Sequence, residues 1–407
     1  MRINKFFPFA FIYFFLNSLG LPFGLTWMAL MAPFFYVWVV WERRKEILLP
    51  FLVALSPFIF IHILVVEVDL KVYLVSLLNI FMVYIFCQAF YTFLLRCSDV
   101  EKIFRKILVI NFVFCLVGIV FFFTPLWHWF WIEQEFTRGV TDFKRFKLFT
   151  YEASYYATLF VPIFFFYLLQ YVLMQNRIAN YLLLPMLFLP FILSFSIGVI
   201  AAALISGILI TIIHYRQLLV KRRIVNTVIN SVLLVGSFLF VLVFYFRHNP
   251  LFTRLLNIFS GRDTSAMGRT SEAFYLAGQM LDEKNEWWGI GVGQVKIVGH
   301  DIIQNYYLYN KDFVATIPNG IAETWAIFGW WGLIIKLSVV IALFFYTKVW
   351  TNYYRLLLFF FIFIYQFTGS FVTNLAEYVI WILAFTNVFP RFDVKPVQRP
   401  VSTISSP

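Results

Sequence analysis

Arginine is the residue whose type and spacing first suggest chemistry in this chain. Arg247, Arg254, Arg262 and Arg269 follow one another at intervals of seven, eight and seven residues, with Asp263 as the one acid among them. A guanidinium binds phosphate through two parallel hydrogen bonds, which the ammonium group of lysine cannot do. These arginines predict a site for a phosphate or pyrophosphate group. Pairing with lipid headgroups, or with the acidic residues that follow in the same stretch, is the alternative explanation.

A second basic group and three possible proton acceptors accompany them. Arg145 lies in a polar stretch with three other cationic residues. Glu152 and Glu323 each stand at the mouth of an apolar run, where a carboxylate is costly unless it is paired, so a function is the first hypothesis and a structural salt bridge is the second. His300 is a third candidate base, with a solvated surface histidine as the alternative. We find no acidic or histidine cluster with ligand spacing, so the sequence predicts no metal.

The elements that must position these residues are membrane helices. Of the 407 residues 62% are hydrophobic and 13% are charged, whereas soluble domains carry roughly twice as much charge. The net charge of +12 reflects basic loops rather than a nucleic-acid site, because no nucleic-acid-binding motif accompanies it. Three cysteines in or beside apolar runs predict no disulfide framework.

Apolar runs of about 18 to 25 residues predict an all-α, polytopic membrane protein with about twelve transmembrane helices in a single domain, 1–407. The expected spans are 6–22, 23–41, 47–66, 72–95, 104–124, 152–173, 181–196, 198–215, 224–246, 319–346, 354–371 and 374–390. The stretch 181–215 fits either two tilted helices or one helix and a re-entrant segment. Basic clusters follow the even-numbered spans, which puts both termini in the cytoplasm and 247–318 outside as one large loop.

A glycine-rich stretch lies in the second half of that loop. Gly289, Gly291 and Gly293 alternate with Ile290 and Val292 after two tryptophans. Without a strand and a helix around them, these glycines do not make a nucleotide fingerprint. They predict a tight turn at the membrane surface, with the tryptophans in the interface.

The order of these features resembles the bacterial O-antigen polymerase and ligase superfamily. Its members carry an arginine, a stretch of about twenty residues and a glycine turn, as at Arg269 and Gly289–Gly293 here. They then carry His-Asn, nine residues and Gly-x-x-Gly; Asn319, Gly329 and Gly332 match this pattern, but Pro318 replaces the histidine.

Two further motifs match earlier in the chain. Arg145, Phe149 and Tyr151-Glu152-Ala153-Ser154 resemble the family's Arg, Phe, Glu-Pro-Ser pattern, with Ala153 in place of proline. Residues 194–198, Ser-Phe-Ser-Ile-Gly, resemble its Ser-Arg-Gly turn. The motifs extend over roughly 140–335, and the topology extends over the whole chain.

The resemblance implies a glycosyltransferase-C-like enzyme of the bacterial inner membrane. Its substrate would be an undecaprenyl-pyrophosphate-linked oligosaccharide, joined to the next repeat unit at the periplasmic face without a cofactor or metal. We expect Arg269 and Arg145 to act on the pyrophosphate, Arg262 and Arg254 to support them, and Gly289, Gly291, Gly293 and Asn319 to contact substrate. A chain-length regulator and a flippase of the same pathway are the expected partners.

Two alternatives remain at this point. The histidine that is thought to activate the acceptor hydroxyl in the ligases is replaced by Pro318, which favours a polymerase over a ligase that transfers polymer to the lipid A core. A lipid-linked oligosaccharide flippase is the alternative from another class. A flippase would line its spans with cationic residues and have short loops, whereas nearly all the charges here lie in loops.

Overall fold

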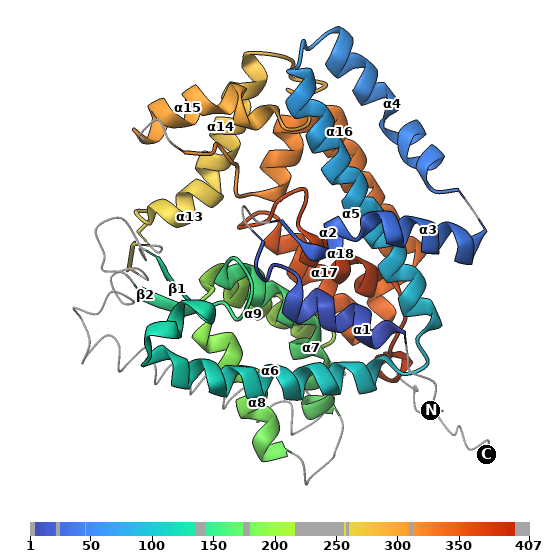
Figure 1. The fold of residues 1–407 in the computed structure, drawn as a ribbon, viewed down its shortest axis with the longest axis vertical. Coiled ribbons are helices and arrows are strands. Elements are labelled where there is room, and N and C mark those ends of the chain that lie inside the picture. Colours follow the sequence, from blue (N-terminus) through green and yellow to red (C-terminus); the bar gives the residue numbers. More distant parts are fainter. Residues whose placement is uncertain are drawn as a thin grey trace, which may run out of the picture.

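The computed structural model describes residues 5–21, 25–44, 46–134, 143–173, 180–215, 256–257, 260–308 and 313–394. Within them the chain is mostly helical, as the sequence predicts, and one short hairpin supplies the two strands of its one sheet (Figure 1). Its first helices are α1 (Phe6–Phe11), η1 (Ile12–Leu16), α2 (Trp27–Leu30), α3 (Ala32–Arg43), α4 (Leu48–Leu64), α5 (Leu70–Arg96) and α6 (Val100–Phe122). The hairpin region follows, with η2 (Pro125–Trp129), β1 (Trp131–Gln134) and β2 (Phe143–Phe146).

The rest of the described chain is again helical. It contains α7 (Ala153–Leu173), α8 (Asn180–Leu193), α9 (Ile197–Ile213), α13 (Thr264–Arg269), α14 (Ser271–Asp282), η3 (Gln294–Lys296), α15 (Val298–Tyr307), α16 (Gly320–Tyr346), η4 (Val349–Thr351), α17 (Tyr353–Tyr365), α18 (Leu375–Phe385) and η5 (Pro390–Phe392). The predicted span 224–246 lies outside the described residues.

Several helices begin where a short polar side chain can cap the first turn. Asp69 accepts a hydrogen bond from the amide of Val72 at the start of α5, and Asp99 accepts one from Lys102 at the start of α6. Asn352 and Asn374 cap α17 and α18 in the same way. A cap of this kind satisfies amides that the helix cannot satisfy itself, so these residues determine where each apolar run becomes helical.

The helices agree with a membrane protein, but the structure does not confirm twelve spans. Among the described residues, α5, α6, α7 and α16 are long and apolar enough, by length and composition alone, to cross a bilayer, although α16 is broken at Gly329. Helices α3 and α4 would make a fifth if that bent pair counts as one span. The remaining apolar helices have 17 residues or fewer. In the stretch 181–215, α8 and α9 are two separate helices that meet at residues 194–196.

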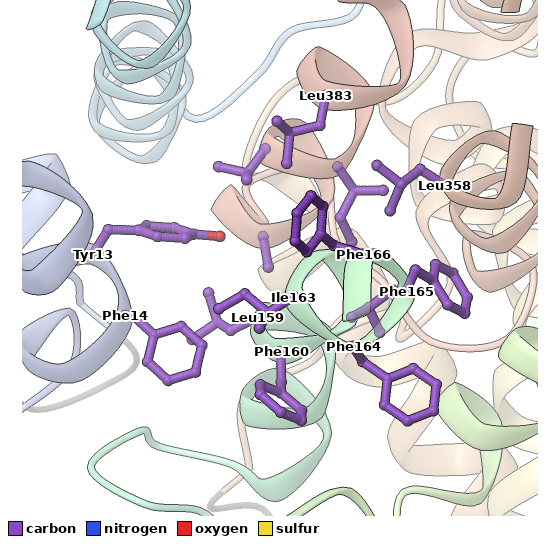
Figure 2. Close-up of a cluster of buried hydrophobic side chains, with 14 of the residues drawn as sticks. Tyr13, Phe14, Leu159, Phe160, Ile163, Phe164, Phe165, Phe166, Leu358 and Leu383 are labelled. Atoms are coloured by element: carbon purple, nitrogen blue, oxygen red, sulfur yellow. The ribbon is translucent and has the colours of Figure 1, made fainter. Parts of the chain in front are cut away.

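The main core surrounds α7, whose side chains are buried on nearly all sides. Figure 2 shows the phenylalanines of α7 between Tyr13 and Phe14 of the first helices and Leu358 and Leu383 of α17 and α18. Phe164 stacks on Phe191 of α8, with ring centroids 4.7 Å apart. Because lipid is as apolar as phenylalanine, close packing rather than exclusion of water holds such helices together.

A smaller core lies under helices α14 and α15, which pack together and lie next to each other in Figure 1. Helix α14 packs on the first half of α16, where Gly278 faces the ring of Trp325. The buried residues of this core include Ala277, Ile290 and Ala326. The predicted external loop is therefore built, in its described part, as a helical cap resting on α16.

Helix α16 is broken at Gly329, which has φ 63° and ψ −163°. These backbone angles lie outside the helical range and outside those accessible to residues with a Cβ atom. The first half, up to Phe328, and the second half, from Trp330, therefore run in different directions. The sequence predicts one span over 319–346, and the break divides it into two shorter helices.

Candidate active site

Arg269 and Glu152 meet although 117 positions separate them in the sequence. Arg269 is the last residue of α13, and Glu152 immediately precedes α7. Arg269 Nη2 lies 3.8 Å from Glu152 Oε1, and the two side chains are 35% and 23% exposed. An ion pair this long and this exposed is weak, so the guanidinium retains the capacity to bind an anion from outside.

Asn319 holds the backbone of Arg269. Its amide Nδ2 donates to the carbonyl oxygen of Arg269 at 2.8 Å and to that of Phe367 at 2.9 Å. Its Oδ1 accepts from the amides of Ile321 and Ala322, which caps α16. These four bonds use the whole hydrogen-bonding capacity of a buried side chain. The geometry thus gives Asn319 a positioning role; the direct substrate contact expected from the sequence would require some of these bonds to break.

The site converges on the connection between α17 and α18, residues 366–374, which we call the α17–α18 turn. Besides receiving the bond from Asn319, this turn approaches Arg269 so closely that a Cβ atom at Gly369 would lie 3.1 Å from Arg269 Nη1. On its other side the amide of Val372 donates to Glu323 Oε2 at 2.7 Å. The turn therefore joins the predicted arginine to the predicted carboxylate of α16.

Arg145 lies on strand β2 and binds the corner between α8 and α9. Its Nε donates to the carbonyl oxygen of Ser194 and its Nη2 to the hydroxyl of Ser196, both at 3.1 Å. The same corner touches the α17–α18 turn, since a Cβ at Gly198 would lie 3.9 Å from the carbonyl oxygen of Thr368. Two motifs that the sequence presents separately, at 145–154 and 194–198, are thus in direct contact.

Burial changes the ionisation of two groups beside these residues. Burial raises the pKa of the Tyr151 phenol well above its usual value, and the nearby Tyr155 and Glu152 add to the effect. Tyr151 therefore stays a neutral hydrogen-bond donor at physiological pH. Burial also lowers the pKa of Lys147. The guanidinium of Arg145 keeps its positive charge, because an arginine is not deprotonated in a protein at physiological pH.

The glycine turn packs against the break in α16. The amides of Ile290 and Gly291 donate to the carbonyl oxygens of Ala326 and Ile327, at 2.9 and 3.0 Å. In the other direction, Trp330 and Trp331 donate to the carbonyl oxygens of residues 286 and 287. These bonds replace those that the helix loses at its break. In an apolar environment, backbone groups that lose their helical hydrogen bonds are tolerated where other parts of the protein bind them.

The turn has no room for side chains at its glycines. A Cβ at Gly289 would lie 2.6 Å from the amide nitrogen of Gly329, and one at Gly291 would lie 2.7 Å from Val68 Cγ1. A Cβ at Gly293 would overlap the side chain of Ser76. All three glycines also have positive φ. The structure gives them a packing role, and the substrate contact expected for them stays a prediction.

The other predicted residues lie apart from this convergence or outside the described residues. His300 lies on the outer helix α15, where its Nδ1 is 3.0 Å from Asp301 and its ring stacks on Phe313. Arg262 is exposed just before α13, and Arg254 lies outside the described residues. Within the described part of the chain, no group of three or more His, Cys, Asp or Glu could hold a metal ion.

An ion pair between the partly exposed Lys336 and the buried Glu377 extends the site into the helices. Lys336 Nζ lies 4.0 Å from Glu377 Oε1. The sequence shows both residues inside apolar runs, where ionisable groups mark functional sites by default. The signal is therefore visible in the sequence, but the pairing is not, because the two residues belong to different helices.

Comparison with known proteins finds a similarity to one family over part of this region. Residues 181–337 match the family model described as O-antigen ligase. The matched segment includes Arg269, Asn319, Glu323 and Lys336, whereas Arg145, Glu152 and the α17–α18 turn lie outside it. No curated protein matches the chain.

Proposed function

We propose, from the premise that residues 181–337 belong to the O-antigen ligase family, that this chain is an O-antigen polymerase. The family match supports a function of the ligase or polymerase type, and the apolar helices support a place in a membrane. The proposed reaction joins oligosaccharide repeat units carried on undecaprenyl pyrophosphate at the periplasmic face of the inner membrane. The observation that carries the proposal is that Arg269 and Glu323 both meet the α17–α18 turn, with Glu152 paired to Arg269 and Arg145 bound to the neighbouring α8–α9 corner.

The chemistry of such a transfer requires what these residues offer. An acceptor hydroxyl attacks the anomeric carbon of the donor glycan, and the bond from that carbon to the pyrophosphate oxygen breaks. The electron pair leaves with the pyrophosphate, so negative charge develops on its oxygens. Arg269 stabilises that charge by exchanging its long ion pair with Glu152 for bidentate contacts to phosphate. A carboxylate at the turn takes the proton of the acceptor hydroxyl.

Glu323 is the carboxylate that suits this role. Glu152 pairs with Arg269 and therefore lies on the side where the leaving group would bind. Glu323 stands on a different helix and is oriented by the amide of Val372 through one of its two oxygens. We expect the leaving group and the acceptor to bind on different sides of the α17–α18 turn.

Pro318 favours a polymerase over a ligase. It occupies the position at which the ligases carry their proposed base, and proline has no group that accepts a proton. The lipopolysaccharide of a strain lacking this chain distinguishes the two activities. A core bearing one repeat unit supports the polymerase, whereas a bare core with intact polymer on the lipid carrier identifies a ligase.

The proposed orientation places α13–α15 in the periplasm and both termini in the cytoplasm. In a variant without the native cysteines, a cysteine at Asn305 should react with a membrane-impermeant thiol reagent in spheroplasts. A cysteine at Lys102 should react only after lysis. The reverse pattern would place the proposed site on the wrong side of the membrane for a periplasmic substrate.

A further inference from the structure

Lys336 does more than pair with Glu377, because it also binds the first turn of its own broken helix. Its Nζ donates to the carbonyl oxygen of Gly320 and to the hydroxyl of Thr324, both at 3.2 Å. In a straight α-helix, residues 16 positions apart would be about 24 Å apart along the axis. The break at Gly329 brings the second half of α16 back against the first and makes this contact possible.

Glu377 binds the α17–α18 turn. Its Oε2 accepts a hydrogen bond from the hydroxyl of Ser370, and its Oε1 accepts one from the indole of Trp381 at 3.3 Å. Ser370 belongs to the α17–α18 turn and also accepts a bond from Asn374 at 3.2 Å. The side chain of Glu377 is 4% exposed, so these partners rather than solvent hold it.

The first turn of α16 and the α17–α18 turn meet directly. A Cβ at Gly320 would lie 3.4 Å from Ser370 Cβ and 3.6 Å from Glu377 Oε2. The first turn of α16 carries Glu323 and begins at Asn319, which holds the backbone of Arg269. The α17–α18 turn contacts the guanidinium of Arg269 and orients Glu323. The relative position of these two turns therefore sets the relative position of the arginine and the carboxylate.

We propose that Lys336 and Glu377 are positioning residues that hold the first turn of α16 against the α17–α18 turn. They touch no substrate; they set the geometry in which Arg269 meets the leaving pyrophosphate and Glu323 meets the acceptor. This inference rests on the proposed transferase function. A misplacement of about 1 Å at a reaction site can slow turnover by roughly 100-fold, so a clamp of this kind acts mainly on kcat.

The test uses full-length protein in lipid nanodiscs and measures elongation of lipid-linked repeat units. Lys336→Met and Glu377→Gln should each lower kcat by about 10- to 100-fold, with the KM for the donor changed by less than about threefold. The double variant should be no slower than the slower single variant, because both changes open one contact. Lys336→Arg keeps the charge and should recover part of kcat.

Lys284→Met is the matched control, because Lys284 Nζ also donates to a backbone carbonyl, that of Val66, at 3.2 Å. It should keep wild-type kcat. The fraction of folded protein is measured for each variant. The proposal is overturned if the activity per folded molecule of the variants stays at the wild-type level, or if the two losses of kcat multiply in the double variant. It is also overturned if neither single variant accumulates in the membrane, because the pair would then serve folding alone. A wild-type protein that elongates nothing refutes the proposed function instead, before any variant is compared.

Discussion

Replacing Arg269 by lysine separates charge from geometry at the proposed pyrophosphate site. Lysine keeps the positive charge but loses the planar fork that binds two phosphate oxygens at once. The backbone of residue 269 would be unaffected, because Asn319 binds its carbonyl oxygen rather than its side chain. The neighbouring α17–α18 turn has no Cβ at Gly369, where the guanidinium passes, so the shorter reach of lysine meets no new obstacle.

The size of the effect follows from the bonds that are lost. The ion pair with Glu152 is long and partly exposed, so its loss costs little stability. A charge-assisted hydrogen bond to phosphate contributes about 1.5 to 3 kcal/mol. Loss of one such bond in the transition state corresponds to a decrease in kcat of about 10- to 100-fold. Arg269→Lys should therefore shorten or abolish the polymer while the protein accumulates normally.

The assay is the lipopolysaccharide ladder at matched expression, supported by elongation kinetics with purified protein. Arg96→Lys is the matched control, because Arg96 forms an exposed ion pair with Glu42 between the ends of α5 and α3. It should leave the ladder unchanged. A full-length ladder from Arg269→Lys, or equal losses in the two variants, would refute the assignment of Arg269 to the pyrophosphate.

Three further predictions test the surrounding structure. A serine at position 319 can still cap α16 but cannot donate to both Arg269 and Phe367, so Asn319→Ser should lower activity about 10-fold while the melting temperature changes little. A loss of activity that is matched by a loss of folded protein would show that Asn319 acts only as a cap. Gly329→Ala places a Cβ 2.5 Å from the amide nitrogen of Gly289 and should prevent accumulation, whereas Gly207→Ala, which faces open space in α9, should accumulate normally on immunoblots of membranes. Purified protein should elongate glycan in excess chelator; a loss restored by Mg²⁺ or Mn²⁺ would show that a metal takes part.

The sequence predicts the helical class and points to several candidate site residues, because both depend on local patterns. Hydrophobic runs identify the helices, and caps such as Asp69 and Asp99 begin them close to the expected residues. Glu152 and Glu323 are recognisable because charge at the edge of an apolar run is costly, and Arg269 because it belongs to a regularly spaced set of arginines. Their meeting is not predictable in this way, because the contact of Arg269 with Glu152 joins residues 117 positions apart.

The α17–α18 turn is the part of the site that the hydropathy of the sequence does not predict. The sequence predicts spans over 354–371 and 374–390, with almost no connection between them. In the structure α17 ends at Tyr365 and α18 begins at Leu375. Phe367, Phe371 and Val372 are apolar and read as membrane residues, yet they lie in a turn that Gly369 and the cap Asn374 permit. An apolar side chain shows that a residue avoids water, but it does not show the backbone conformation. That conformation depends on glycines and on capping residues.

The broken helix shows how the two glycine motifs of this chain depend on each other. The Gly-x-x-Gly motif, seen alone, is part of a 27-residue apolar run that predicts one continuous span. A break at Gly329 would leave carbonyl groups of Ala326 and Ile327 and amides of the following tryptophans without partners in an apolar environment. The glycine turn supplies those partners, and it can approach only because Gly289 and Gly329 both lack a side chain. The break in turn lets Lys336 reach Gly320, and so brings a charge to the first turn of α16. The two glycine motifs are therefore two sides of one contact, and a substitution in either should disturb the same set of residues around Asn319 and Glu323.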